Sequence, residues 1–161
     1  MRSSDYFLLM FCKLDVQLSP PISESESSNS LALKFSKLIS KIADFSQNAV
    51  VNLSCWGEAL LNQNLLKMID CILSYSGLSV LIELSQLNLS DEKLQKISEI
   101  VKNSPERTNG KEKIYWIVSV DACNQDSYQK IHGNSSNFEE TCQSILKLSS
   151  LFENSVYRCS D

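Results

Sequence analysis

The sequence predicts an α/β fold, in which a parallel sheet of about four to five strands alternates with helices. Short apolar runs rich in β-branched residues alternate along the chain with segments whose apolar residues recur every three or four positions. The runs are apolar almost throughout, which indicates strands buried on both faces, as in parallel sheets. Right-handed crossovers then bring the carboxyl ends of all strands to one edge, where α/β folds bind their ligands.

Composition narrows the possible functions. The 161 residues predict one domain, and the net charge of −4 comes without any basic cluster, so nucleic acid is not an expected partner. The longest apolar run, residues 6–11, is too short to span a membrane, and the chain is expected in the cytoplasm. The six cysteines are scattered, as in reduced cytoplasmic proteins, and predict no disulfide framework.

The first 30 residues are expected to be irregular. They contain a short possible strand at residues 6–11 and a stretch rich in serine and proline at residues 19–30, which predicts a mobile loop. Residues 31–161 form the predicted domain, which opens with a helix capped by Ser30. The apolar face of this helix is Leu31, Phe35, Leu38, Ile42 and Phe45.

Two strands and two helices follow. A strand at residues 49–54 leads into the turn Trp56-Gly57-Glu58, and a helix begins near Asn62. Gly77 follows this helix, where glycine is expected to relieve left-handed backbone strain. The next strand covers residues 79–83, and Ser90 is expected to cap the third helix, with Asp91 and Glu92 in its first turn.

The last part of the chain repeats the pattern. Residues 103–113 are polar and predict a loop, and residues 113–120 form the clearest strand of the sequence. A short helix is expected at residues 126–131, before Gly133, and a longer one at about residues 137–153. A fifth strand is expected to start at Ser155.

Polar side chains follow the predicted strands at the edge where ligands bind. Glu58 comes after the glycine of the tight turn, and Glu83 ends an apolar strand. Ser119 and Asp121 are two residues apart and therefore share one face of their strand. Such groups suit a ligand that carries an amine, a ribose or a carboxylate.

Each candidate also has a structural alternative. Glu58 fits a solvated loop, and Glu83 fits a strand end that points to water. Asp121 fits a cap of the helix that begins near Asn124. His132 is the single histidine, and it fits a surface or capping role better than catalysis, because no carboxylate or serine is paired with it nearby in sequence.

Three segments resemble the radical S-adenosylmethionine (SAM) superfamily. Leu53-Ser54-Cys55-Trp56-Gly57-Glu58-Ala59-Leu60-Leu61 is similar to the second-strand motif of that family, which usually ends Gly-Glu-Pro-Leu. Leu81-Ile82-Glu83-Leu84-Ser85 stands where many members have a Glu-Thr-Asn/Asp-Gly turn. Trp116-Ile117-Val118-Ser119-Val120-Asp121-Ala122, with residues 128–133 and 138–140 after it, resembles the fourth strand and the helix start that follows it.

The resemblance covers about residues 35 to 157 and is nearest to the branch of iron-sulfur oxidoreductases that carries a SPASM domain. It implies a partial (β/α)₆ TIM-like barrel that binds SAM at the carboxyl ends of its strands. By the same resemblance, the SAM-binding residues are Gly57, Glu58, Glu83, Ser119 and Asp121. In the family, a [4Fe-4S] cluster cleaves SAM reductively to a deoxyadenosyl radical.

The sequence departs from the family at the cluster. The cluster needs three thiolates spaced CxxxCxxC after the first strand. Here Cys12 follows the predicted first strand, but Val16 and Ser19 stand at the other two positions. No metal ligand and no catalytic residue is therefore assigned.

Two functional hypotheses follow from the sequence. In the first, the chain is a fragment or a degenerate form of a radical SAM oxidoreductase, whose partners are a small-molecule cofactor and the remainder of a longer chain. In the second, it is a non-enzymatic α/β binding or interaction domain. Neither hypothesis includes nucleic acid or a membrane as a partner.

Overall fold

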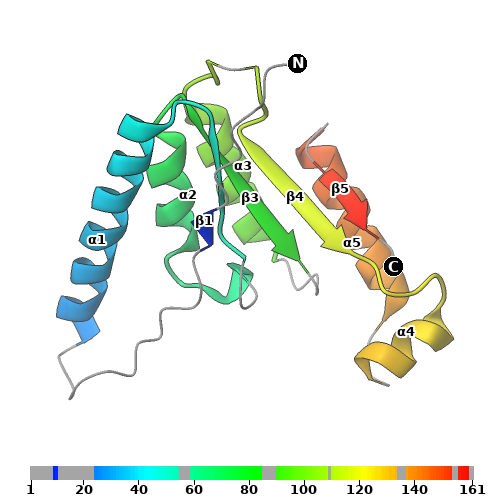
Figure 1. Ribbon diagram of the computed structural model, residues 1–161. Coiled ribbons are helices and arrows are strands. Elements are labelled where there is room, and N and C mark those ends of the chain that lie inside the picture. Colours follow the sequence, from blue (N-terminus) through cyan, green and yellow to red (C-terminus); the bar gives the residue numbers. More distant parts are fainter. Residues whose placement is uncertain are drawn as a thin grey trace.

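The computed structural model describes the backbone of residues 9–10, 24–54, 59–84, 90–108, 110–133, 137–153 and 156–159 (Figure 1). Side chains are described within these ranges from residue 33 to residue 153.

A small parallel sheet forms the centre of the molecule. Its body is the three strands β2 (Ala49–Asn52), β3 (Leu78–Leu84) and β4 (Ile114–Ser119). The short strands β1 (Leu9–Met10) and β5 (Val156–Cys159) pair in parallel at the two margins. The order across the sheet is the order along the chain, β1-β2-β3-β4-β5.

The α/β class and the parallel pairing agree with the sequence, but the prediction of a partial (β/α)₆ TIM-like barrel with four to five strands was wrong. Only β2, β3 and β4 make up the body of the sheet, and among the described strands no pairing joins the two margins, so the sheet is open. An alternating strand and helix pattern determines parallel pairing. Closure depends on strand tilt and stagger, which that pattern does not encode.

Five α-helices accompany the sheet in the described part of the chain. They are α1 (Glu24–Phe45), α2 (Leu65–Leu73), α3 (Asp91–Asn103), α4 (Gln125–His132) and α5 (Phe138–Leu151), with a 3₁₀ turn, η1 (Ala59–Leu61). Helices α2, α3 and α5 lie behind the strands, α1 flanks them on the β1 side, and α4 stands apart beyond the tip of β4 (Figure 1). Within the described ranges, no helix combines the length and the apolar character needed to cross a membrane.

Several helix ends agree with the sequence. The Ser90 hydroxyl accepts the Lys93 N–H at 3.3 Å, and the Asn137 side chain accepts the Glu139 N–H at 3.0 Å. Helix α1 differs, because it begins at Glu24 and so includes part of the loop predicted for residues 19–30. The last proline of that stretch is Pro21, so no residue after it forbids a helix.

The two faces of the sheet have different surroundings. One face is buried in the core shared with the helices, and its residues are Ala49, Val51, Val80, Ile82, Leu84, Ile114, Trp116 and Val118. Trp116 is fully buried, and its ring centroid lies 5.3 Å from that of Phe152. On the opposite face, Leu81, Tyr115 and Ile117 are only half-buried.

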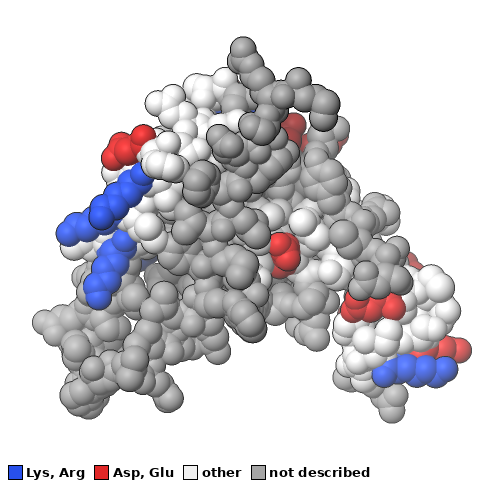
Figure 2. All heavy atoms as spheres, viewed as in Figure 1, with Lys and Arg blue, Asp and Glu red and all other residues white. Residues whose placement is uncertain are grey.

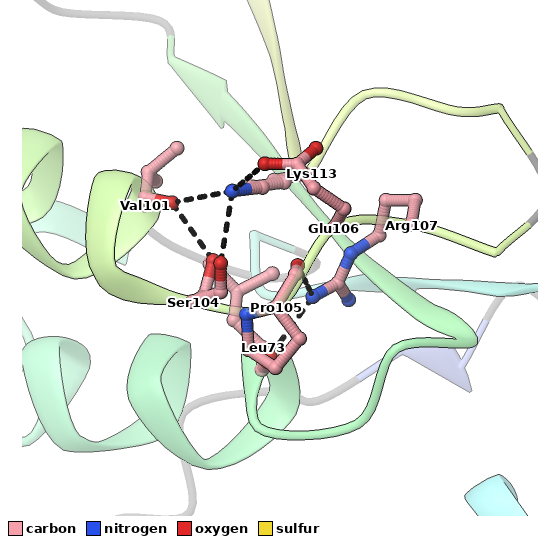
Figure 3. A network of polar contacts seen from close by, with 7 residues as sticks. All are labelled: Leu73, Val101, Ser104, Pro105, Glu106, Arg107 and Lys113. Atoms are coloured by element: carbon pink, nitrogen blue, oxygen red, sulfur yellow. Dashed lines mark hydrogen bonds and ion pairs between the residues drawn. The ribbon is translucent and has the colours of Figure 1, made fainter.

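At the amino edge of the sheet, three cationic side chains from the segment 107–113 bond to backbone carbonyls near the helix ends. Arg107 donates to the carbonyls of Leu73 and Pro105 (Figure 3), at 2.9 and 2.7 Å, and also to those of Tyr75 and Leu78. Carbonyls at a helix C-terminus carry partial negative charge, which favours a cation there. The arginine therefore joins the end of α2 to the start of β3.

Lys113 and Lys111 also donate to backbone carbonyls, in the turns that follow α3 and α1. Lys113 donates to the carbonyls of Val101 and Ser104, at 3.1 and 2.9 Å, and pairs with the Glu106 carboxylate at 2.8 Å (Figure 3). Its hydrogen bond and charge lower the pKa of Glu106. Lys111 donates to the Asn48 carbonyl at 3.3 Å, in the turn between α1 and β2. One short segment thus binds the turns that follow α1, α2 and α3.

Gly77 has a different role from the one its position in the sequence indicates. Its φ angle is not positive, so it relieves no left-handed strain; the described glycines with positive φ are Gly110 and Gly133. A Cβ atom built on Gly77 would lie 2.6 Å from the backbone oxygen of Gln47. Glycine is therefore required because the turn between α1 and β2 packs directly against it.

Gly77→Ala is expected to lower the free energy of unfolding by about 2–4 kcal/mol, because backbone has to move to admit the methyl group. Gly110→Ala serves as the control, because a Cβ there meets nothing within 4 Å and only its φ of 70° is unfavourable. The control is expected to cost about 1 kcal/mol. Urea unfolding followed by circular dichroism measures both, and an equal loss would contradict the role assigned to the packing against Gln47.

Candidate functional site

The carboxyl edge of the sheet holds those predicted site residues that the structure describes. Glu83 lies near the end of β3, Ser119 is the last residue of β4, and Asp121 follows two residues later. Gly57 and Glu58, which the resemblance also assigns to the site, lie outside the described residues. So does Cys12.

Glu83 is held in place by two residues at the end of β2. Its carboxylate accepts a hydrogen bond from the Asn52 side chain at 2.6 Å, and its backbone N–H donates to the Ser54 hydroxyl at 2.8 Å. The carbonyl oxygen of the Asn52 side chain in turn accepts the Ser54 N–H at 2.8 Å. Asn52 is buried and Glu83 is exposed. The buried amide therefore orients a carboxylate that solvent can reach.

The strand register places this carboxylate on the half-buried face of the sheet. Glu83 is opposite Ile117, and Leu81 is opposite Tyr115, so these four residues share that face. Ser119 lies on the same face one row further along β4, and it is exposed. The site thus combines the negative charge of Glu83, the hydroxyl of Ser119 and the apolar surface of the neighbouring side chains on this face.

On the face seen in Figure 2, the described charges at this edge are acidic. Figure 2 shows acidic side chains over the ends of β3 and β4 and beside α4, while the lysines in this view gather over α1 and at the far end of α4. No described basic side chain lies next to the acidic group at the end of β3 in this view. A positively charged ligand suits these acidic side chains better than an anion does.

Asp121 has a partner that the sequence did not indicate. Its Oδ2 atom lies 3.0 Å from Nε2 of His132, at the end of α4. The contact lacks the alignment of a linear hydrogen bond, and Nε2 has no other partner among the described residues. The imidazole also packs on the Tyr128 ring, with centroids 4.4 Å apart. Asp121 does not cap α4, because the side chain of Asn124 accepts the Ser127 N–H at 2.9 Å and caps it instead.

The described residues do not fit an iron-sulfur cluster. No group of three or more His, Cys, Asp or Glu side chains in the described part of the chain is placed to hold a metal. Three thiols are described, those of Cys71, Cys123 and Cys142, and they are unpaired. Burial, followed by the charge of Asp70, raises the pKa of the Cys71 thiol, which therefore suits packing better than metal binding.

A separate hollow of about 260 Å³ lies at the opposite, amino edge of the sheet. Its lining includes Ser46, Gln47, Tyr75, Ser76 and Thr108. Among the described residues, its lining contains no carboxylate, histidine or lysine, and Glu83, Ser119 and Asp121 do not border it. The hollow is therefore not part of the candidate site at the carboxyl edge.

Sequence reasoning missed Asn52, Ser54 and Arg107. Asn52 had a usable signal, because a polar amide inside an apolar strand needs a partner when buried. Ser54 and Arg107 had none, because Ser54 contacts Glu83 and Arg107 contacts Leu73 and Leu78, which lie 29 to 34 residues away.

Comparisons with known proteins give little further information. No family model matches the chain, and no solved structure matches it. A protein of Treponema pallidum (strain Nichols), named "Uncharacterized protein", is 39% identical over 95 residues. The match covers 59% of this chain and 26% of that relative, so the chain spans about a quarter of the relative's length.

Proposed function

We propose that the carboxyl edge of the sheet binds a small molecule that carries an amino group, with Glu83 as the anionic contact. The observation that carries this proposal is the exposed Glu83 carboxylate, which the buried Asn52 amide orients at 2.6 Å. A fixed carboxylate loses little freedom when it accepts an ammonium group, which favours binding.

The neighbouring residues support a ligand that also has a flat apolar part. The half-buried side chains of Leu81, Tyr115 and Ile117 offer an apolar surface beside the carboxylate, and the Ser119 hydroxyl suits a sugar hydroxyl. SAM combines an amino group, a ribose and an adenine, and it is the candidate that the family resemblance supplies. Such a ligand is met in the cytoplasm, the location that the composition predicts.

The proposal is limited to binding. Reductive cleavage of SAM needs a cluster held by three thiolates, and the sequence places Val16 and Ser19 where two of them belong. The residues present do not fit that cluster, and no step through it is proposed.

Titration calorimetry with SAM tests the proposal. Glu83→Gln is expected to weaken binding about 10- to 150-fold, because a charge-assisted contact worth roughly 1.5–3 kcal/mol is lost. Glu112→Gln is the matched control, since it removes the same charge from an exposed residue just before β4, at the amino edge of the sheet. Absence of SAM binding, or equal effects of the two variants, would remove Glu83 from the proposed site.

A second candidate function is a protein-interaction domain that uses the same face. The observation in its favour is the apolar character of Leu81, Tyr115 and Ile117 on the half-buried side of the sheet. Size-exclusion chromatography with light scattering separates the two candidates. Self-association that Tyr115→Glu abolishes would favour the interaction domain, and a monomer that binds SAM would favour the ligand site.

A further inference from the structure

We propose that α4 is latched to the carboxyl edge by the contact between Asp121 and His132, and that a ligand amine that takes Asp121 releases the helix. This regulation rests on the proposed function, since it concerns the same edge of the sheet. The latch itself is a property of the chain without any ligand.

Helix α4 depends on tertiary contacts for its order. It has only eight residues, Gln125–His132, and Tyr128 is the one described as buried. An isolated helix of this length is marginal in water. In Figure 1 it lies beyond the tip of β4, beside the start of α5. Its persistence therefore depends on the few contacts that fasten it.

Most of these contacts join α4 to the start of α5. The Tyr128 hydroxyl lies 2.9 Å from that of Thr141, and its ring lies 5.6 Å from that of Phe138. The side-chain oxygen of Gln125 accepts the Phe138 N–H at 2.8 Å. Helix α5 is itself fixed in the core by Ile145 and Leu148, so these contacts hold the first turns of α4 in place and leave its last turn to the contact with Asp121.

The contact between His132 and Asp121 is different, because it joins the last residue of α4 to the chain just beyond β4. The His132 side chain is 12% exposed and the Asp121 side chain is 36% exposed. The imidazole is enclosed, whereas the carboxylate is open to an incoming group. The 3.0 Å separation without linear alignment makes this a contact that another donor can replace.

A ligand amine is a suitable competitor for Asp121. An ammonium group brings a full positive charge and three N–H donors, so the amine that binds Glu83 keeps further donors for Asp121. An imidazole is a full cation only when it is protonated. Asp121 lies two residues beyond Ser119, which belongs to the proposed site. Occupation of Asp121 by the ligand would leave Nε2 of His132 without a polar partner among the described residues and remove the polar contact between α4 and the strand end.

Hydrogen exchange read by mass spectrometry tests the latch. Asp121→Asn is expected to raise amide exchange in residues 125–132 about fivefold or more, which corresponds to the loss of roughly 1 kcal/mol, while exchange in α3 stays unchanged. His132→Gln is expected to give the same pattern. Asp44→Asn, an exposed carboxylate on α1, is the control and is expected to leave α4 protected. Unchanged exchange of α4 in Asp121→Asn would overturn the latch, whatever the ligand result.

Saturating SAM tests the release. In the wild type it is expected to raise exchange in α4 and to shift the ring signals of the single histidine in NMR spectra, and in Asp121→Asn it is expected to add no further exchange. SAM that binds by calorimetry and leaves α4 protected would overturn the release alone. No SAM binding would overturn the proposed function and the release with it, and the Asp121→Asn result would still decide the latch.

Discussion

Arg107→Met is expected to lower the free energy of unfolding by about 3–5 kcal/mol, a large part of the total for a domain of this size. Arg107 is 8% exposed, and its guanidinium donates to the carbonyls of Leu73, Tyr75, Leu78 and Pro105. Methionine fills similar space but donates nothing, so buried carbonyls lose their partner, at about 1–3 kcal/mol for each group that water does not reach. Desolvation lowers the pKa of Arg107, against the opposing effect of Glu106, which shows that the charge is held in a poorly solvated place.

Two further variants show whether the loss comes from the hydrogen bonds. Arg107→Lys keeps the charge but not the planar set of donors, and is expected to lose an intermediate amount. Lys102→Met removes a charge from the exposed face of the last turn of α3 and is expected to change stability by about 0.5 kcal/mol or less. Urea unfolding of the three variants gives the comparison. A loss below about 1 kcal/mol for Arg107→Met would show that water replaces the arginine at these carbonyls.

Trp116→Ala is expected to cost about 3–5 kcal/mol, because it empties the largest fully buried side-chain position of the described core. Trp116 is opposite Ile82 in the sheet, and its ring lies 5.3 Å from that of Phe152, the residue that ends α5. The variant therefore weakens both the sheet and the packing of the last helix. Loss of near-ultraviolet circular dichroism at a lower urea concentration is the expected observation.

Trp116→Phe is a sharper test of the same position. The indole Nε1 is buried and has no hydrogen-bond partner among the described residues, so its removal offsets part of the volume lost. The expected cost is about 1–2 kcal/mol, clearly below that of alanine. Equal losses in the two variants would indicate that the indole nitrogen makes a hydrogen bond that stabilises the folded protein.

The order of helices and strands could be predicted from the sequence because it depends on local patterns. Periodic apolar residues identified α2, α3, α5 and most of α1, and the cap Ser90 acts within three residues of itself. Closure of the sheet could not be predicted, because an open sheet and a barrel begin with the same repeated unit. Gly77 was predicted just beyond the end of a helix, but it lies immediately before β3, and the backbone of Gln47, 30 positions earlier in the chain, requires it to be glycine.

For the candidate site, too, the position could be predicted from the sequence, whereas the contacts of its side chains could not. Its position at the carboxyl ends of the strands follows from parallel pairing, and Glu83 and Ser119 lie on one face as their spacing and register require. The partners of the acidic groups depend on how elements meet in space. Asn52 meets Glu83 because of the pairing between β2 and β3, and His132 meets Asp121 because α4 turns back towards the strand end.

The sequential strand order bears on how the chain acquires its structure. Each of the strands β2 to β5 pairs with the strand that precedes it in the sequence, so no strand has to wait for a later segment to separate it from its neighbour. Pairing between consecutive strands closes a shorter loop than a crossover that skips a strand would, so the loop-closure cost is lower than in such an order. During synthesis, β3 can add to β2 as soon as it leaves the ribosome, and β4 can then add to β3. The nascent chain therefore offers each new strand a ready template, and the growing edge of the sheet stays open to aggregation until the next strand adds.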